Sequence, residues 1–331
     1  CSSDLAVDIG VRADAETLAD LMVSDLAGDG PKLRSTIPSV LDALVDDGTL
    51  IKLDKEYSLQ TRESAEWDRE FRNRQTKLNG DGAKVSGIRS DLLKAACTDA
   101  LKAMKLLHGQ SKVVRKTYLH FGPDEPRPQG NEIPVWVRDQ WGASEKEVVT
   151  DARAAGSDSP TVFVFIPRRG AADLQKAIVD YEAAESTLGF KGAPSSDEGR
   201  DARSSMATRK MTAEQTRNQL VRELLDDAKV FQGGGNEAYG LTLTDKVKMV
   251  AEHSMDRMFP RFRDGDDVRW HAVITKAKAG SEDALQSVGW QGAPETHPVC
   301  SAVLSAVGSG VKGKDVRDQL EGPPTGWPRD A

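Results

Sequence analysis

A glycine- and lysine-containing segment near the end of the chain has most features of a phosphate-binding loop. Residues 308–315, GSGVKGKD, match the pattern G-x-x-x-x-G-K but not the Ser or Thr that should follow it. In such loops the backbone N–H groups and the lysine bind phosphate oxygens, and the final hydroxyl holds Mg²⁺. Asp315 stands at that last position, so a carboxylate would face the phosphates instead.

The residues before this segment predict a helix, whereas a phosphate-binding loop follows a strand. Four apolar residues recur there at the spacing of one helix face: Val299, Val303, Leu304 and Val307. We therefore predict that residues 308–315 connect two helices, in preference to forming an ATP site.

A second candidate site lies where two predicted parallel strands end. Residues 133–137 and 161–166 are typical of strands, and a capping box of Ser144 and Glu147 begins a helix between them. This order predicts a βαβ unit with parallel strands and a right-handed crossover. Ligands of such sheets bind beyond the C-terminal ends of the strands. The candidate anion or partner site there consists of Arg138, Asp139, Arg168 and Arg169.

Each of these polar features has a structural alternative, which we favour. The arginines could pack over Trp136 or Trp141 or pair with acidic side chains. The glycine run at residues 233–236 could cradle an anion, but a flexible turn between helices is the simpler interpretation. The five histidines have no telling spacing with Cys97 or Cys300, so we assign no catalytic residue and no metal ligand.

Helices followed by a β-hairpin are predicted for residues 14–61, which is the arrangement of a winged helix. We expect Asp14 to cap the first helix and Pro38 to lie in the first turn of the second. Two short strands are expected at residues 50–53 and 57–59.

Charge decides between the two common roles of such a module, DNA contact and protein packing. Residues 14–61 contain ten acidic and four basic residues, a balance of −6 within a chain of net charge −7. DNA phosphates require concentrated Lys and Arg, so we favour structural packing and keep DNA contact as the alternative. The basic residues available for DNA are Lys32, Arg34, Lys52 and Lys55.

The whole chain has the composition of a globular protein, with 331 residues, 38% apolar and 29% charged. No run of about 18 apolar residues is present, so we expect no membrane span. The three cysteines are scattered, without a CxxC pair, which favours a reducing, cytoplasmic location over a disulfide framework or a zinc site.

We predict a mixed α+β fold that is mainly helical. Its expected segments are a winged-helix domain (1–61), a helical connector (62–110), an α/β domain (111–190), a helical region (191–265) and a helical, truncated winged-helix-like unit (266–331). A break is expected in the connector at residues 79–82, and residues 327–331 are expected to begin a helix.

Five stretches together resemble the BrxC/PglY family, the large P-loop ATPases of bacterial BREX and phage-growth-limitation defence. The resemblance covers essentially the whole chain in the same order. The stretches are residues 59–74 (LQTRESAEWDREFRNR), 133–141 (IPVWVRDQW), 158–168 (DSPTVFVFIPR), 229–237 (KVFQGGGNE) and 297–331.

The resemblance implies that this chain is an internal part of a longer ATPase. ATP and Mg²⁺ would bind in an N-terminal domain that precedes Cys1, with no cofactor in the residues here. A mature lipoprotein can also begin with Cys-Ser-Ser, but we favour the internal fragment. The implied partners are other BREX components, including a DNA methyltransferase and a phosphatase-like protein, and further copies of the protein itself.

These observations lead us to expect a non-catalytic scaffold or coupling region. The alternatives are a DNA-contacting winged-helix module and an α/β domain that binds a phosphate-bearing ligand or acts on one.

Overall fold

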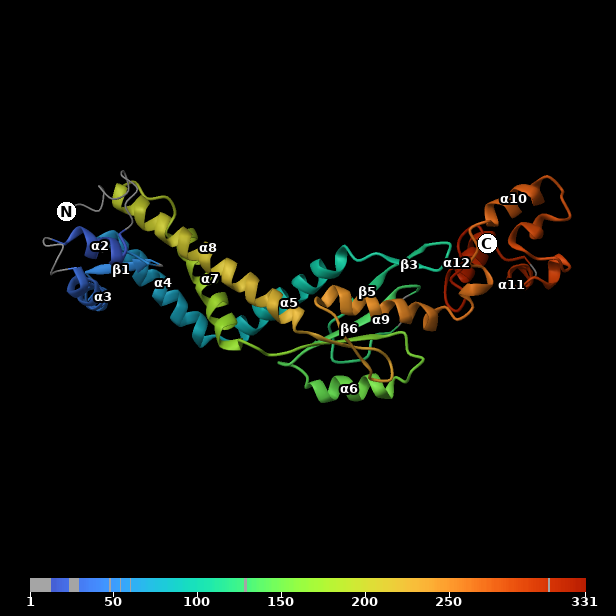
Figure 1. Ribbon diagram of the computed structural model, residues 1–331, viewed down its shortest axis with the longest axis horizontal. Helices are drawn as coiled ribbons and strands as arrows, with labels where there is room; N and C mark the ends of the chain where they lie inside the picture. The colour runs from blue at the N-terminus through green and yellow to red at the C-terminus, as the bar shows by residue number, and fades with distance from the viewer. Residues whose placement is uncertain are drawn as a thin grey trace. The chain divides into compact units, whose positions relative to one another are not determined.

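The computed structural model describes residues 13–23, 30–47, 49–53, 55–59, 61–127, 130–308 and 310–331. The fold is mixed α+β and mainly helical, as predicted (Figure 1). The chain divides into two compact units, each made of two stretches of sequence. Unit 1 comprises Cys1–Ser90 and Ala171–Leu220, and unit 2 comprises Asp91–Gly170 and Val221–Ala331. The boundaries between these units differ from the segment boundaries that we expected from the sequence.

The first part of unit 1 consists of two helices and a β-hairpin. They are α2 (Ala15–Leu21), α3 (Gly30–Asp46) and the antiparallel strands β1 (Leu50–Leu53) and β2 (Glu56–Leu59). Asp14 caps α2 as predicted, because its carboxylate accepts a 2.8 Å hydrogen bond from the Thr17 N–H. The order of helices and hairpin agrees with the predicted one, whereas a winged helix remains a prediction. A small core holds the elements together: Ala19, Ile37, Leu41 and Tyr57.

The prediction that Pro38 lies in the first turn of the second helix is wrong. α3 begins at Gly30, and Pro38 lies in its interior. A proline there removes one helical hydrogen bond. The helix nevertheless continues, because Ile37 and Leu41 are four residues apart and are both buried in the same core.

Long helices form the rest of unit 1. α4 (Arg62–Gly80) ends at Gly80, Asp81 is its C-cap, and α5 (Gly82–Lys102) follows at once, which confirms the predicted break. α7 (Ala171–Lys191) packs against α4, and Trp67 and Phe71 of α4 are buried. α8 (Asp197–Asp226) is 30 residues long. The unit boundaries fall within α5 and α8.

A five-stranded sheet with the order β5-β6-β7-β8-β9 forms the centre of unit 2. β5 (Thr117–His120), β6 (Ile133–Asp139) and β7 (Val162–Ile166) are parallel, whereas β8 (Lys229–Phe231) and β9 (Glu237–Ala238) are antiparallel additions. α6 (Glu145–Ala154) connects β6 to β7, which confirms the predicted parallel strands with a helix between them. Both halves of the predicted capping box are present at Ser144 and Glu147.

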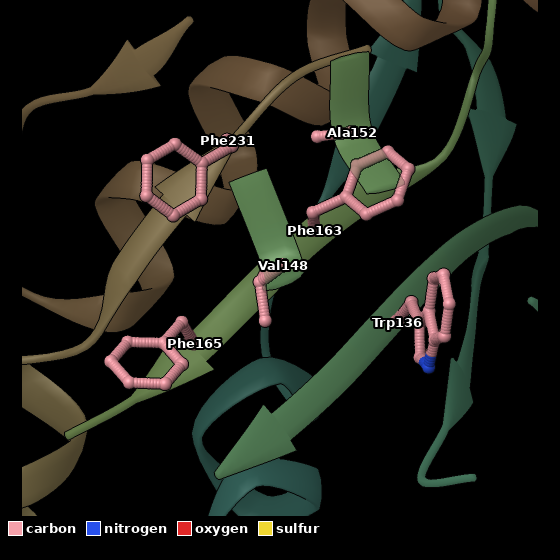
Figure 2. Packing of buried hydrophobic residues seen from close by; sticks show 6 residues of the cluster. All are labelled: Trp136, Val148, Ala152, Phe163, Phe165 and Phe231. Atoms are coloured by element: carbon pink, nitrogen blue, oxygen red, sulfur yellow. The ribbon is translucent and has the colours of Figure 1, made fainter. Parts of the chain in front are cut away.

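The two faces of this sheet pack against different helices. Figure 2 shows the aromatic side chains of β6, β7 and β8 gathered against Val148 and Ala152 of α6. No residue of α9 (Leu243–Met258) belongs to this cluster, although α9 contacts β6, β7, β8 and β9. α9 therefore covers the opposite, valine-rich face. The aromatic cluster contains Trp136, Phe163, Phe165 and Phe231.

Residues 113–121 contain two strands in different sheets, since β4 (Val113–Arg115) pairs with β3 (Leu106–His108) before β5 begins. Two sequence-based expectations for unit 2 are wrong. The region 191–265 is not wholly helical, because β8 and β9 complete the sheet. The glycine run at 233–235 therefore connects two strands and not two helices. Neither β8 nor β9 is long enough to show an alternating pattern.

The remainder of unit 2 is a series of short helices. They are the 3₁₀ helix η1 (Phe262–Asp264), α10 (Trp270–Lys278), η2 (Ala284–Val288), η3 (Pro294–Thr296), α11 (Pro298–Val307) and α12 (Gly313–Glu321). Residues 327–331 contain a short turn at 329–330 and not the expected start of a helix. Among the described residues, no helix combines the length and apolar character needed to cross a membrane.

Candidate functional site

The C-terminal edge of the parallel strands is the site that the sequence favoured, and Arg138 lies there at the end of β6. Its guanidinium lies over the Trp136 ring, 4.0 Å from the centroid. It also forms an ion pair with Asp151 of α6 at 2.7 Å, and only 11% of its side chain is exposed. Arg138 is therefore held between the sheet and α6.

The backbone N–H groups after β6 would suit an anion, but side chains of the same segment already occupy them. The Asp139 carboxylate accepts hydrogen bonds from the N–H groups of Trp141 at 2.9 Å and Gly142 at 3.2 Å. At the start of α6, Glu147 accepts from the Ser144 N–H at 2.6 Å and from its hydroxyl. These bonds hold the pKa of Glu147 below its usual value.

The two arginines after β7 are also engaged within the chain. The Arg168 backbone N–H donates to the Gln140 side chain at 2.7 Å, and its guanidinium lies 5.8 Å from the Trp141 ring centroid. Arg169 forms an ion pair with Asp227 at 2.8 Å. Gln140 thus joins the loop containing Asp139 to the loop containing Arg168, whereas the Arg138 and Arg169 side chains lie against Asp151 and Asp227.

The nearby cysteine is poorly suited to act as a nucleophile. Cys97 of α5 is fully buried. Burial, and to a smaller extent the Asp139 carboxylate, raise the pKa of its thiol to about 12. A thiol with this pKa is almost entirely protonated at neutral pH, whereas nucleophilic chemistry needs the thiolate.

The segment that resembles a phosphate-binding loop connects two helices, as predicted. α11 ends at Val307, Gly308 caps it with positive φ, and Lys312 is the N-cap of α12. Lys314 and Asp315 lie exposed in the first turn of α12. A phosphate-binding loop requires a preceding strand, and the element here is α11.

The four candidate DNA-contacting residues lie exposed on the helices and hairpin of unit 1. Arg34 of α3 pairs with Asp20 of α2 at 2.8 Å. Lys52 of β1 pairs with Asp42 of α3 at 3.0 Å and also lies 5.0 Å from the Tyr57 ring centroid. Lys32 and Lys55 form no ion pair within the described residues. Two of the four positive charges are thus neutralised locally.

The glycine run has a packing role that its sequence did not reveal. The Gly234 N–H donates to the Ala152 carbonyl at 2.7 Å. A Cβ atom at Gly233 would lie only 2.5 Å from the Gly156 carbonyl oxygen, so a side chain cannot fit. The β8–β9 turn therefore lies directly against the end of α6.

A buried polar cluster in unit 2 escaped the sequence analysis. One member, Asp266, lies more than 150 residues after the others, so no local pattern marks the cluster. It contains His108 of β3 and Arg115 of β4, both 5% exposed. Asp266 caps the turn between these strands by accepting hydrogen bonds from the N–H groups of Gln110 and Ser111, each at 2.8 Å.

A groove of about 500 Å³ in unit 1 lies between α7 and α8. Partners within the unit are present for Lys52, Lys176, Asp180 and Arg209 of its lining. Arg209 pairs with Asp68 at 2.9 Å, and Lys176 pairs with Asp180 at 2.5 Å. In the described part of the chain, no three His, Cys, Asp or Glu side chains gather as metal ligands would.

Comparison with known proteins found no matching family model, no matching curated protein and no matching solved structure.

Proposed function

We propose that this chain is a non-catalytic scaffold or coupling region of a BREX-type anti-phage defence ATPase. It would act in the cytoplasm, associating with itself or with other components of the system. The proposal rests on the resemblance to the BrxC/PglY family and on one structural observation. At the edge of the parallel sheet, Asp139 occupies the backbone N–H groups after β6, and Arg138 and Arg169 form ion pairs with carboxylates of the same chain.

This observation favours a framework over a binding site for a simple electrostatic reason. A ligand phosphate would have to displace Asp139 from the backbone N–H groups of Trp141 and Gly142. It would also have to compete with the carboxylate partners of Arg138 and Arg169. These internal bonds instead hold the loops after β6 and β7 in one arrangement, which suits a rigid surface for protein contacts.

The test is to measure assembly and ligand binding with the same purified chain. Sedimentation velocity over a range of concentrations should reveal self-association, or gel filtration should show co-elution with the methyltransferase or phosphatase-like component. A chain that stays monomeric and binds neither component would contradict the proposal. Salt-sensitive binding to duplex DNA would favour the winged-helix alternative instead.

The ligand-binding alternative is tested with an Arg168→Gln, Arg169→Gln double variant. Under the scaffold proposal, isothermal titration with inorganic phosphate or ATP gives no saturable heat for either the variant or the unchanged chain. Saturable binding that the double variant abolishes would instead support a phosphate site at the sheet edge.

A further inference from the structure

The segment after α12 folds back over the buried cluster of unit 2. We call residues 322–327 the strap. The Trp327 side chain is only 3% exposed, and its indole N–H donates to the Arg261 carbonyl at 2.8 Å. The Arg261 N–H in turn donates to the Pro324 carbonyl at 3.1 Å. The strap is therefore bonded to the loop around η1 at two points.

Arg115 provides a third attachment, in an unusual environment for a cation. Its guanidinium donates to the Gly326 carbonyl and lies 3.9 Å from the Phe259 ring centroid. Within the described residues no carboxylate forms an ion pair with Arg115, and burial lowers its pKa to about 10. Backbone and aromatic groups thus stabilise this charge in place of an acid.

His108 lies directly beside the Arg115 attachment. A guanidinium nitrogen of Arg115 lies 3.4 Å from Nδ1 of His108, so Nδ1 can accept from it only while it carries no proton. The His108 ring also stacks on Phe262, with centroids 3.7 Å apart. Protonation of Nδ1 would remove this acceptor and place a second positive charge beside Arg115.

The acidic groups around His108 compensate this repulsion only in part. Asp256 of α9 lies 3.6 Å from Nε2, but its side chain is 65% exposed and hydrated. Asp266 is already occupied by the N–H groups of Gln110 and Ser111. Burial, followed by the charge of Arg115, holds the pKa of His108 below its ordinary value despite both carboxylates.

We propose that the strap is a pH-sensitive latch, closed while His108 is neutral and released in mild acid. When the strap opens, His108 becomes exposed to water and titrates with its ordinary pKa of about 6.5. Because the open state then binds protons more readily than the closed one, opening becomes more favourable as the pH falls below about 6.5. Opening stops becoming more favourable once the pH is below the lowered pKa of His108 in the closed state.

A second histidine near the strap is the rival sensor. His297 is 7% exposed and lies between Trp270 and Trp290, and burial also lowers its pKa. Its Nδ1 accepts from the Val299 N–H at 3.1 Å, so it too is neutral in this arrangement. The experiment must therefore separate the two histidines.

Amide hydrogen exchange on the full chain tests the proposal. The reporters are the N–H groups of Gly326 and Trp327, which donate to the carbonyls of Gly322 and Leu320. Between pH 7.5 and 5.0, their protection relative to intrinsic exchange should fall below about pH 6.5, by up to about tenfold per pH unit. The amides of β6 and β7 should keep their protection. Equal loss in the strap and the sheet would overturn the latch, as would constant protection of the strap.

Matched variants identify the sensor. In His108→Asn the amide oxygen can replace Nδ1 as the acceptor without titrating, so the strap should stay protected at every pH. His297→Asn should keep the pH dependence. The reverse pattern would overturn the role of His108. An NMR titration of the unchanged chain gives an independent check. The midpoint for His108 should lie below about 6.5, at the pH where the loss of strap protection levels off, and a midpoint at or above 6.5 contradicts the proposal.

Discussion

The sheet of unit 2 and the helices of unit 1 bury side chains of different chemistry. In the sheet, Phe163 is completely buried in an aromatic cluster with its neighbours and α6. In unit 1, the buried surface of α4 includes a charged residue, Asp68, beside Trp67 and Phe71. Arg72 and Arg209 satisfy that carboxylate at 2.7 and 2.9 Å.

This difference predicts different responses to substitution. Apolar burial is non-directional and scales with area, so losing one aromatic ring from the sheet removes a large contribution. A buried ion pair contributes less, because the desolvation cost offsets much of the attraction. Loss of an aromatic ring from the sheet should therefore cost more stability than loss of the charge of Asp68 from α4.

The largest effect is expected for Phe163→Ala. The vacated space beside Trp136 and Phe231 should destabilise unit 2 by about 3–5 kcal/mol. Amide exchange of β6 and β7 measures this loss, and the helices of unit 1 serve as an internal reference. The control is Phe190→Ala, at a side chain that is 69% exposed. A similar loss in both variants would remove the distinction between core and surface aromatics.

An intermediate effect is expected for Asp68→Asn. The amide keeps the shape of the side chain but removes the negative charge that pairs with Arg72 and Arg209, so we expect a loss of about 1–3 kcal/mol. Exchange of the α4 amides reports it. Asp197→Asn is the matched control, because the Asp197 side chain is 91% exposed and also pairs with an arginine. If Asp68→Asn changes nothing, unit 1 is held by its apolar contacts alone.

The smallest effect is expected for Arg34→Gln. Its ion pair with Asp20 is exposed on both sides, so hydration replaces it at little cost and the thermal midpoint should not change measurably. The affinity of this variant for duplex DNA is a second measurement, which tests the DNA-binding alternative. A loss of duplex affinity at unchanged stability would show that the first helices of unit 1 contact nucleic acid, contrary to the scaffold proposal.

Local signals in the sequence predicted several elements correctly. The capping box at Ser144 and Glu147 marked the start of α6, and the apolar run at residues 161–166 marked β7. The helical spacing of residues 299–307 was enough to show that Lys314 follows a helix. Each signal depends on residues within one or two turns of each other, so the chain carries it locally.

The candidate sites depended on contacts that no local pattern records. The sequence placed Arg138, Asp139, Arg168 and Arg169 near one edge of a sheet, and the structure brings them there. The sequence did not predict which acidic side chain or aromatic ring each of them contacts. Asp227, for example, is 58 residues from Arg169 and reaches it because β8, which begins two residues later at Lys229, pairs with β7.

What the sequence alone determined is the order of helices and parallel strands, because capping, periodicity and apolar runs act over a few residues. The tertiary structure decided the rest. Only in the folded chain do the three residues of β8 join the sheet, and only there does Arg115 donate to the Gly326 carbonyl, 211 positions away. The tertiary structure also paired Arg138 with Asp151 and Arg169 with Asp227. Such contacts arise only when distant segments pack together, because their free energy comes from shared burial and not from the propensity of any one segment.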